Sequence, residues 1–158
     1  MIAQAGRLIR FFALIITALS LAACGSNPRV SAMDPPAGTG AKAAAVALEQ
    51  VGQPYRYGGR APGGFDCSGL VQYSYGLAGV KVPRTTGQLW LAARPVGPRE
   101  MRAGDLLFFS IEGKMSHVGV YLGEQRFVHA PQSGRRVSVA SLDAPFYREA
   151  FLRAGRIY

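Results

Sequence analysis

Two different spacings of apolar and polar residues occur along the chain, one typical of helices and one typical of strands. Strong helix formers fill residues 41–51 and predict the first helix. A second helix is predicted over residues 67–78, where Asp66 can cap the start. A short third helix is predicted over residues 85–92.

The later part of the chain alternates apolar and polar residues in short runs, which is typical of strands. The predicted strands cover residues 105–109, 116–122, 125–130, 136–139 and 150–154. Helices therefore precede strands, and the links between strands are too short for crossover helices. The pattern predicts an α+β domain with a largely antiparallel sheet.

A hairpin between the second and third predicted strands would bring two histidines together. A tight turn around Gly123 and Glu124 pairs the strands so that His117 lies opposite His129. The period of two then puts both imidazoles on one face, while the valines of these strands fill the other face. A one-residue change in the turn would instead separate the two imidazoles onto opposite faces.

The first 23 residues have the pattern of a cleaved export signal. Arg7 and Arg10 precede an apolar stretch over residues 11–21, which is too short to span a bilayer comfortably. The small residues before Cys24 look like a bacterial lipobox, in which the cysteine becomes the lipid-modified N-terminus. An ordinary cleavage site that happens to precede Cys24 is the alternative.

The remaining chain divides into a linker and one domain. Residues 24–40 are rich in Gly, Pro, Ser and Thr and lack hydrophobic periodicity, which predicts a flexible tether. Residues 41–158 are enough for a single hydrophobic core and too few for two. The sequence therefore predicts one folded domain held to a membrane by the lipid on Cys24.

A basic charge balance indicates an anionic partner. The full chain has 18 basic and 9 acidic side chains, and removing the signal, which holds two arginines and no acids, leaves a formal charge of +7. For an exported protein the candidates are a carboxylate-rich wall polymer and anionic lipids. No basic run is long enough for a nucleic-acid arm, so no nucleic-acid partner is expected.

The second cysteine, Cys67, needs a chemical explanation. Two cysteines in an exported domain normally indicate one disulfide, but lipidation of Cys24 leaves Cys67 without a partner. A free thiol is either an inert buried residue or a nucleophile. The polar neighbours Asp66 and Ser68 favour the nucleophile.

Cys67, His117 and His129 together provide the groups that thiol acyl transfer requires: a thiolate, a base and an orienting group. The start of a helix favours the thiolate, whereas Asp66 disfavours it unless the carboxylate caps the helix or binds substrate. Structural histidines and a zinc site are the alternatives. Zinc normally takes four ligands with two close in sequence, and no such pair exists here, so no metal or other cofactor is expected.

Six blocks of sequence carry a resemblance to a known family. They are residues 52–59, 64–73, 83–88, 103–109, 116–123 and 127–130. In this order they resemble the NlpC/P60 family of cell-wall cysteine peptidases, and specifically its lipoprotein murein endopeptidases. The resemblance implies a papain-like α+β fold, in which the helix bearing the nucleophile packs on a mainly antiparallel sheet of five or six strands.

The same resemblance implies a role for individual residues. Cys67 corresponds to the nucleophile, His117 to the general base and acid, and His129 to the group that orients His117. Tyr55 matches a tyrosine near the oxyanion. The positions expected to line the substrate groove are Asp66, Ser68 and Arg84.

The function implied is hydrolysis of peptidoglycan at an amide of the stem peptides. The expected bond is the cross-link from D-Ala to meso-diaminopimelate, and the alternative is the bond from γ-D-Glu to meso-diaminopimelate. A non-hydrolytic wall-binding lipoprotein and acyl transfer to an acceptor other than water are further alternatives. Gly25 after Cys24 favours the periplasmic face of the outer membrane. We expect a monomer controlled by an adaptor or a protease.

Overall fold

The structure, a computed structural model, describes residues 38–158. Three helices lie in the first half of this part: α2 (Thr39–Glu49), α3 (Cys67–Leu77) and α4 (Thr86–Ala92). All three predicted helices are confirmed, each within two residues at both ends. The export signal over residues 1–23, Cys24 and the tether up to residue 37 lie outside the described residues.

The first helix begins two residues earlier than predicted, since α2 starts at Thr39 rather than at residue 41. Gly40 is buried, and a side chain there would collide with Tyr158 and with the carbonyl of Ala103. This glycine therefore serves a close contact between α2 and the C-terminal part of the chain. The residues around Gly40 have the composition of a linker, which explains why the sequence predicts the helix to start only at residue 41.

Side-chain caps fix the starts of the two later helices. Asp66 Oδ1 accepts the backbone N–H of Gly69 at 2.7 Å, as predicted for the cap of α3. Thr85 and Gln88 form a capping box at α4. Each cap contributes about 1 kcal/mol to helix stability. Cys67 is therefore held at the first position of α3.

A close backbone contact joins α3 to the glycine-rich loop before it. A Cβ on Gly69 would overlap the carbonyl oxygen of Gly59, which accepts the backbone N–H of Asp66 at 3.1 Å. Only glycine at position 69 allows this approach. The loop that carries Tyr55 is thereby fixed against the first turn of α3.

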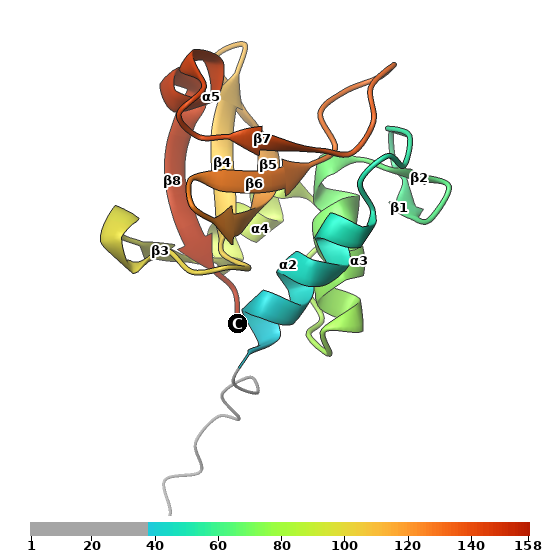
Figure 1. The fold of residues 1–158 in the computed structure, drawn as a ribbon, viewed down its shortest axis with the longest axis horizontal. Helices are drawn as coiled ribbons and strands as arrows, with labels where there is room; N and C mark the ends of the chain where they lie inside the picture. The colour runs from blue at the N-terminus through green and yellow to red at the C-terminus, as the bar shows by residue number, and fades with distance from the viewer. Residues whose placement is uncertain (1–37) are drawn as a thin grey trace, which may run out of the picture. The chain divides into compact units, whose positions relative to one another are not determined.

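A six-stranded antiparallel sheet forms the rest of the domain (Figure 1). In spatial order its strands are β3 (Arg94–Val96), β8 (Phe151–Arg156), β4 (Leu106–Ile111), β5 (Lys114–Gly123), β6 (Arg126–His129) and β7 (Ser138–Ser141). Helices α2, α3 and α4 contact β5. The predicted α+β fold, with the helix of Cys67 on an antiparallel sheet, is confirmed.

Five short elements were not predicted from the sequence. They are β1 (Arg60–Ala61), β2 (Gly64–Phe65), β3, the 3-10 helix η1 (Pro98–Glu100) and α5 (Pro145–Ala150). Elements of two to six residues are too short to display a period. The strand predicted at residues 136–139 instead occupies 138–141, because Arg136 forms an isolated bridge with Pro54.

The predicted register of the central hairpin is wrong. Val120 pairs with Val128, so His117 does not lie opposite His129. The turn residues are Glu124–Gln125, both with positive φ, and the pairing is irregular just before them. This turn lies later than predicted, and the register moves by two residues. A shift of two preserves the face of every side chain, so both histidines still lie on one face.

Two hydrophobic clusters cover the two faces of the sheet. Val118, Val120 and Val128 pack in the cluster that includes the helices, as the alternation predicted. Phe109 and Phe127 belong to the second cluster, on the face of the histidines. All five side chains are fully buried, and each contributes about 2 kcal/mol to folding. The strands that position the histidines are therefore held on both sides.

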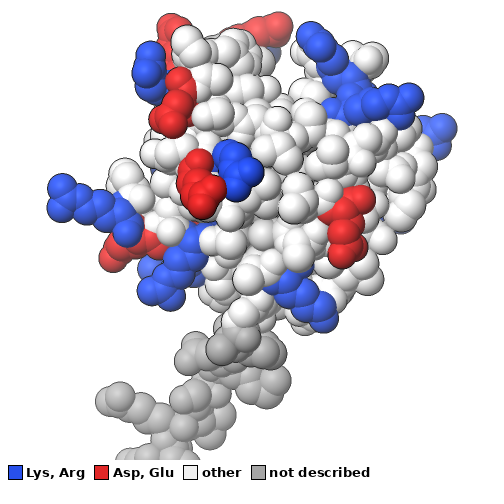
Figure 2. Space-filling model, viewed as in Figure 1, with Lys and Arg blue, Asp and Glu red and all other residues white. Residues whose placement is uncertain are grey.

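The surface of the described part carries both charge signs. Figure 2 shows basic and acidic side chains interspersed over one face, with basic side chains gathered near the loop that joins β6 to β7. Within residues 38–158, no helix has the length and apolar character that crossing a bilayer requires.

Candidate active site

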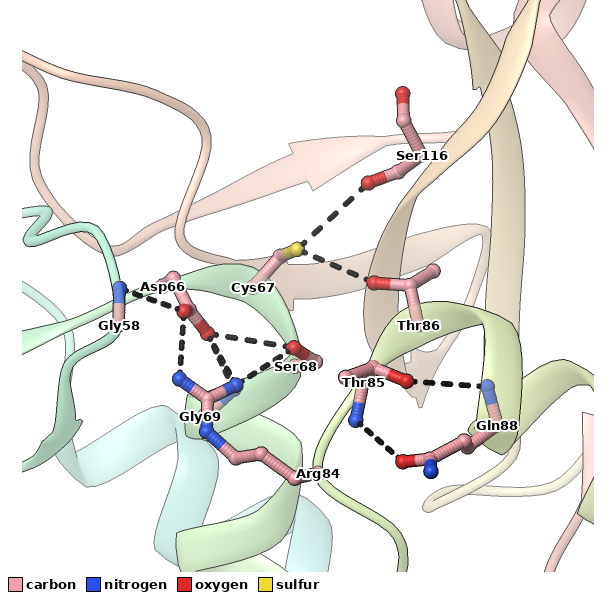
Figure 3. A network of polar contacts seen from close by, with 10 residues as sticks. All are labelled: Gly58, Asp66, Cys67, Ser68, Gly69, Arg84, Thr85, Thr86, Gln88 and Ser116. Carbon is pink, nitrogen blue, oxygen red and sulfur yellow. Dashed lines mark hydrogen bonds and ion pairs between the residues drawn. The ribbon is translucent and has the colours of Figure 1, made fainter.

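Cys67 lies where the first turn of α3, the start of α4 and β5 meet. Its thiol is free and half-buried. Sγ lies 3.6 Å from the hydroxyl of Thr86 and 3.9 Å from the carbonyl oxygen of Ser116 (Figure 3). Three segments far apart in sequence therefore surround the sulfur.

A saturated carboxylate lies beside the thiol. Asp66 accepts hydrogen bonds from the backbone N–H groups of Gly58 and Gly69 at 2.9 and 2.7 Å, and forms an ion pair with Arg84 at 2.7 Å. Ser68 donates to the same carboxylate at 3.3 Å and accepts from Arg84 at 2.9 Å (Figure 3). Asp66 thus caps the helix, the first of the two predicted arrangements, and Arg84 balances its charge.

The two histidines are in direct contact. His117 Nε2 lies 2.8 Å from His129 Nδ1, and the rings are nearly perpendicular at 80°. Burial lowers the pKa of His117 to about 4. Burial, and secondarily His117, lower the pKa of His129 to about 3. The prediction that the two imidazoles meet is confirmed, and at neutral pH both are uncharged.

The thiol is also uncharged in the resting site. Burial raises the pKa of Cys67, and the neighbouring Asp66 raises it further. Hydrogen bonds from Thr86 and from the backbone of Val118 and Ser68 act in the opposite direction, but do not outweigh burial. The resting site therefore holds an uncharged thiol and two uncharged imidazoles around one cavity, without the thiolate that the helix start alone would favour.

One cavity of about 730 Å³ collects the predicted catalytic side chains. Cys67, His117, His129 and Tyr55 all line it. Burial raises the pKa of Tyr55, as do Cys67 and Asp66 nearby, so its hydroxyl stays protonated. The structure thus brings together four of the predicted site residues. The part of Tyr55 in oxyanion binding stays a prediction.

Asp66, Ser68 and Arg84 are not among the residues that line the cavity. They bind one another at the start of α3, as described above. Their contact with a substrate stays a prediction. Among residues 38–158, no three His, Cys, Asp or Glu side chains are grouped so that they could hold a metal ion.

Two side chains in the site were missed by sequence reasoning. Thr86 contacts the sulfur, although its position within the block 83–88 was noted. Tyr147 Oη lies 3.2 Å from His129 Nε2. In the sequence Thr86 lies at the start of the helix predicted over residues 85–92, which indicates no contact with the sulfur, and Tyr147 belongs to α5, an element with no periodic signal.

Other walls of the cavity carry charged and aromatic side chains. Glu112 comes from the turn between β4 and β5, and Arg135 and Arg136 come from the loop between β6 and β7. Phe146, which is 60% exposed, lies at the edge of the cavity. The site can therefore accept a ligand with charged groups beside an apolar surface.

The chain is similar to known wall enzymes. It is 38% identical over 116 residues to the murein DD-endopeptidase MepH of Escherichia coli, an alignment that covers 70% of this chain and 43% of MepH. It is 42% identical over 115 residues to the bifunctional muramidase/DL-endopeptidase CwlT of Bacillus subtilis, covering 70% of this chain and 34% of CwlT. The chain thus spans less than half the length of these two relatives.

The fold is similar to that of solved structures. The peptidoglycan hydrolase RipB of Mycobacterium tuberculosis superposes with a TM-score of 0.66 at 31% identity, covering 78% of this chain and 68% of that one. The model of the NlpC/P60 family matches residues 52–156, which include all the site residues described above. Because this family model and these relatives both match the chain, the chain belongs to the NlpC/P60 family.

Proposed function

We propose that this protein is a peptidoglycan hydrolase that cuts an amide bond of murein stem peptides with Cys67 as nucleophile. The observation that carries the proposal is the convergence of Cys67, His117 and His129 on one cavity, with the two imidazoles 2.8 Å apart. Relatives named as murein and peptidoglycan enzymes support the choice of substrate.

The contacts of His117 support Nδ1 as the nitrogen that acts as the base. Nε2 is engaged by His129, which leaves Nδ1 to take the proton of the Cys67 thiol. The thiolate then attacks the amide carbonyl carbon, and the His117 imidazolium gives its proton to the leaving amine. Water, activated by the same imidazole, hydrolyses the thioester and restores the thiol.

The start of α3 supplies stabilisation for the negative oxygen that forms during attack. Backbone N–H groups of the first turn point toward this end of the helix, and the helix dipole adds positive potential. Tyr55, whose hydroxyl stays protonated, is the proposed side-chain donor. Such donors contribute most where water is excluded, and Cys67 is half-buried.

The charges of the cavity fit an anionic peptide. Arg135 and Arg136 lie on one wall, on the loop near which basic side chains gather in Figure 2. Stem peptides carry free carboxylates, with which guanidinium groups form paired hydrogen bonds. The excess of basic over acidic side chains in the whole chain also attracts an anionic peptide, at longer range.

The bond we propose is the cross-link from D-Ala to meso-diaminopimelate, with the bond from γ-D-Glu to meso-diaminopimelate as the alternative. The names of the relatives include both specificities, since MepH is a DD-endopeptidase and CwlT a DL-endopeptidase. The purified full chain is incubated with cross-linked and uncross-linked muropeptides of known structure, and the products are identified by mass. Each bond gives fragments of different mass.

The matched control for this experiment is Cys67→Ser, which keeps the size of the side chain. We expect cleavage by the unaltered protein and none by the variant. Equal cleavage by both would remove Cys67 from the mechanism. Binding of muropeptides without any product would favour the wall-binding alternative, and a product joined to an added amine would favour acyl transfer.

We also propose that Cys24 carries the lipid and anchors the protein at the periplasmic face of the outer membrane. The order of basic, apolar and small residues before Cys24 supports this. Radiolabelled palmitate should enter the unaltered protein and not the Cys24→Ala variant. Fractionation of cell membranes then tests the location, and label on both proteins would contradict the lipid site.

A further inference from the structure

Tyr147 contacts the histidine pair through His129. Its ring packs against Phe109 and Phe127 at centroid distances of 5.6 and 5.0 Å, and its hydroxyl lies 3.2 Å from His129 Nε2. His129 is only 2% exposed, and its other ring nitrogen contacts His117. Both nitrogens of this buried ring therefore have one partner each among the described residues.

The number of protons in this chain of groups limits how they can be arranged. Each neutral imidazole carries one N–H, and the contact of 2.8 Å between the rings requires one donor and one acceptor. If His117 donates from Nε2, its Nδ1 has a free lone pair and His129 carries its proton on Nε2. If His129 donates instead, His117 carries its proton on Nδ1 and cannot act as a base there.

The charged state leaves only one arrangement. Once His117 takes the thiol proton, both of its nitrogens carry hydrogen, so His129 Nδ1 must accept. His129 then has its own proton on Nε2, where the Tyr147 hydroxyl is the neighbouring acceptor. Without that acceptor a buried N–H would be unpaired during the reaction, at a cost of free energy.

We propose that Tyr147 is a positioning residue, whose hydroxyl accepts the Nε2–H of His129 and so holds His117 in the tautomer that can take the proton of Cys67. This inference rests on the cysteine mechanism proposed above. Tyr147 acts through His129 and does not touch the reacting atoms. It would be the fourth member of a chain from thiol to imidazole to imidazole to phenol.

The surroundings keep this phenol protonated. Burial raises the pKa of Tyr147, and Arg135 lowers it by a smaller amount. Other charged or titratable groups that share the cavity are Glu112, Arg136, Tyr55 and Cys67. A protonated phenol can accept from His129 with its oxygen while its own hydrogen points toward the cavity.

The first test replaces Tyr147 with Phe, which keeps the packing of the ring. We expect kcat on muropeptides to fall about 10- to 100-fold, the loss expected for an unpaired buried donor in the transition state, with KM changed less than about twofold. The acid limb of the pH profile of kcat, which is set by protonation of His117, should move to lower pH, because the imidazolium is less stable. The matched control, Tyr158→Phe, removes a hydroxyl that contacts Ala103 and Asp105 outside the cavity.

The second test needs no substrate, so it stands even if the proposed murein activity fails. The rate of alkylation of Cys67 by iodoacetamide is followed against pH by mass analysis of the peptide that contains Cys67. In Tyr147→Phe the rate of alkylation at pH 7 should fall by about tenfold, because transfer of the thiol proton to His117 gives a less stable imidazolium. Tyr158→Phe should match the unaltered protein.

A third measurement reads the tautomer directly. In the nitrogen-15 NMR spectrum of the unaltered protein, His129 should carry its proton on Nε2 and His117 on Nε2. A proton on Nδ1 of His129 would overturn the proposal. So would an alkylation profile and a pH profile of Tyr147→Phe equal to those of Tyr158→Phe.

Discussion

Two polar networks lie beside Cys67, and one is charged whereas the other is uncharged. On one side, Asp66 and Arg84 form a charged pair in which the carboxylate is saturated by hydrogen bonds. On the other side, His117 and His129 are buried and uncharged. The charged network fixes the helix that carries the sulfur. An imidazole of the neutral network can take up one more proton, which is what a base requires.

The comparison also explains why Asp66 raises the pKa of Cys67 less than burial does. A carboxylate next to a thiol disfavours the thiolate, but the Arg84 guanidinium at 2.7 Å offsets the charge. The hydrogen bond to Asp66 in turn raises the pKa of Arg84, so the pair stays ionised. Positioning and proton transfer are thus assigned to different groups, and changes in either network should have different consequences.

The largest expected effect comes from removing the base in the neutral network. His117→Gln should lower kcat on muropeptides by about 10³- to 10⁴-fold, since it removes the proposed base. Melting should remain cooperative because glutamine keeps a polar group near His129. Steady-state kinetics and circular dichroism check this. Activity within tenfold of the unaltered protein would show that His117 is not the base.

Acid should affect the neutral network through the stability of the fold. The pKa values of His117 and His129, about 4 and about 3 in the folded protein, lie below the ordinary 6.5, so the unfolded chain binds more protons between these limits. Stability is therefore fully present above about pH 6.5 and declines as pH falls toward 4, by about 6 kcal/mol for the two histidines together. Urea unfolding at several pH values measures the decline.

The double variant His117→Gln, His129→Gln sharpens this prediction. It should lose most of the decline between pH 6.5 and 4, because the groups that take up protons on unfolding are gone. An unchanged decline in the double variant would assign the acid sensitivity to other groups.

Breaking the charged network should chiefly cost stability. Arg84→Met leaves the carboxylate of Asp66 mostly buried without its counter-ion, and we expect a loss of about 2 kcal/mol in the free energy of unfolding, moderated because Arg84 is partly exposed. The matched control is Arg126→Met, which breaks an exposed pair with Glu124 and should cost less than about 1 kcal/mol. Equal losses would show that the ion pair of Asp66 and Arg84 stabilises the fold no more than the exposed pair of Arg126 and Glu124.

The smallest expected effect lies at the point where the two networks meet. The Thr86 hydroxyl lies 3.6 Å from Sγ and lowers the pKa of Cys67. Thr86→Val, in which the side chain keeps its shape, should raise the pKa of Cys67 and slow its alkylation at pH 7 by about threefold. In Thr86→Ser, which keeps the hydroxyl, Cys67 should be alkylated at the original rate. Faster alkylation of the valine variant would reverse the assigned role.

The parts of the fold that sequence predicted are those with local signals. The sequence predicts Asp66 as a helix cap and a helix start at residue 85 or 86, because capping depends on a few neighbouring residues. The hairpin register depends on the turn, and the two positive φ values at Glu124 and Gln125 could not be read from residues that rarely adopt them. The histidines met nevertheless, because the error was an even number of residues.

The site was predicted less completely for a similar reason. Cys67, His117 and His129 are rare residue types whose chemistry attracts attention in a sequence. Tyr147 is one of seven tyrosines, and its importance depends only on a tertiary contact with His129. The short helix that presents it has no period and begins at a proline. Neither composition nor spacing could have separated it from the other six.

The contact between Gly59 and Gly69 has a consequence for variation in this protein. Because the backbones touch, the loop that carries Tyr55 and the helix that carries Cys67 move as one body. A single added methyl group at position 69 would push the two backbones apart and so increase the distance between the side chains of Cys67 and Tyr55. The spacing between the loop of Tyr55 and the first turn of α3 is thus set by the absence of a side chain at position 69.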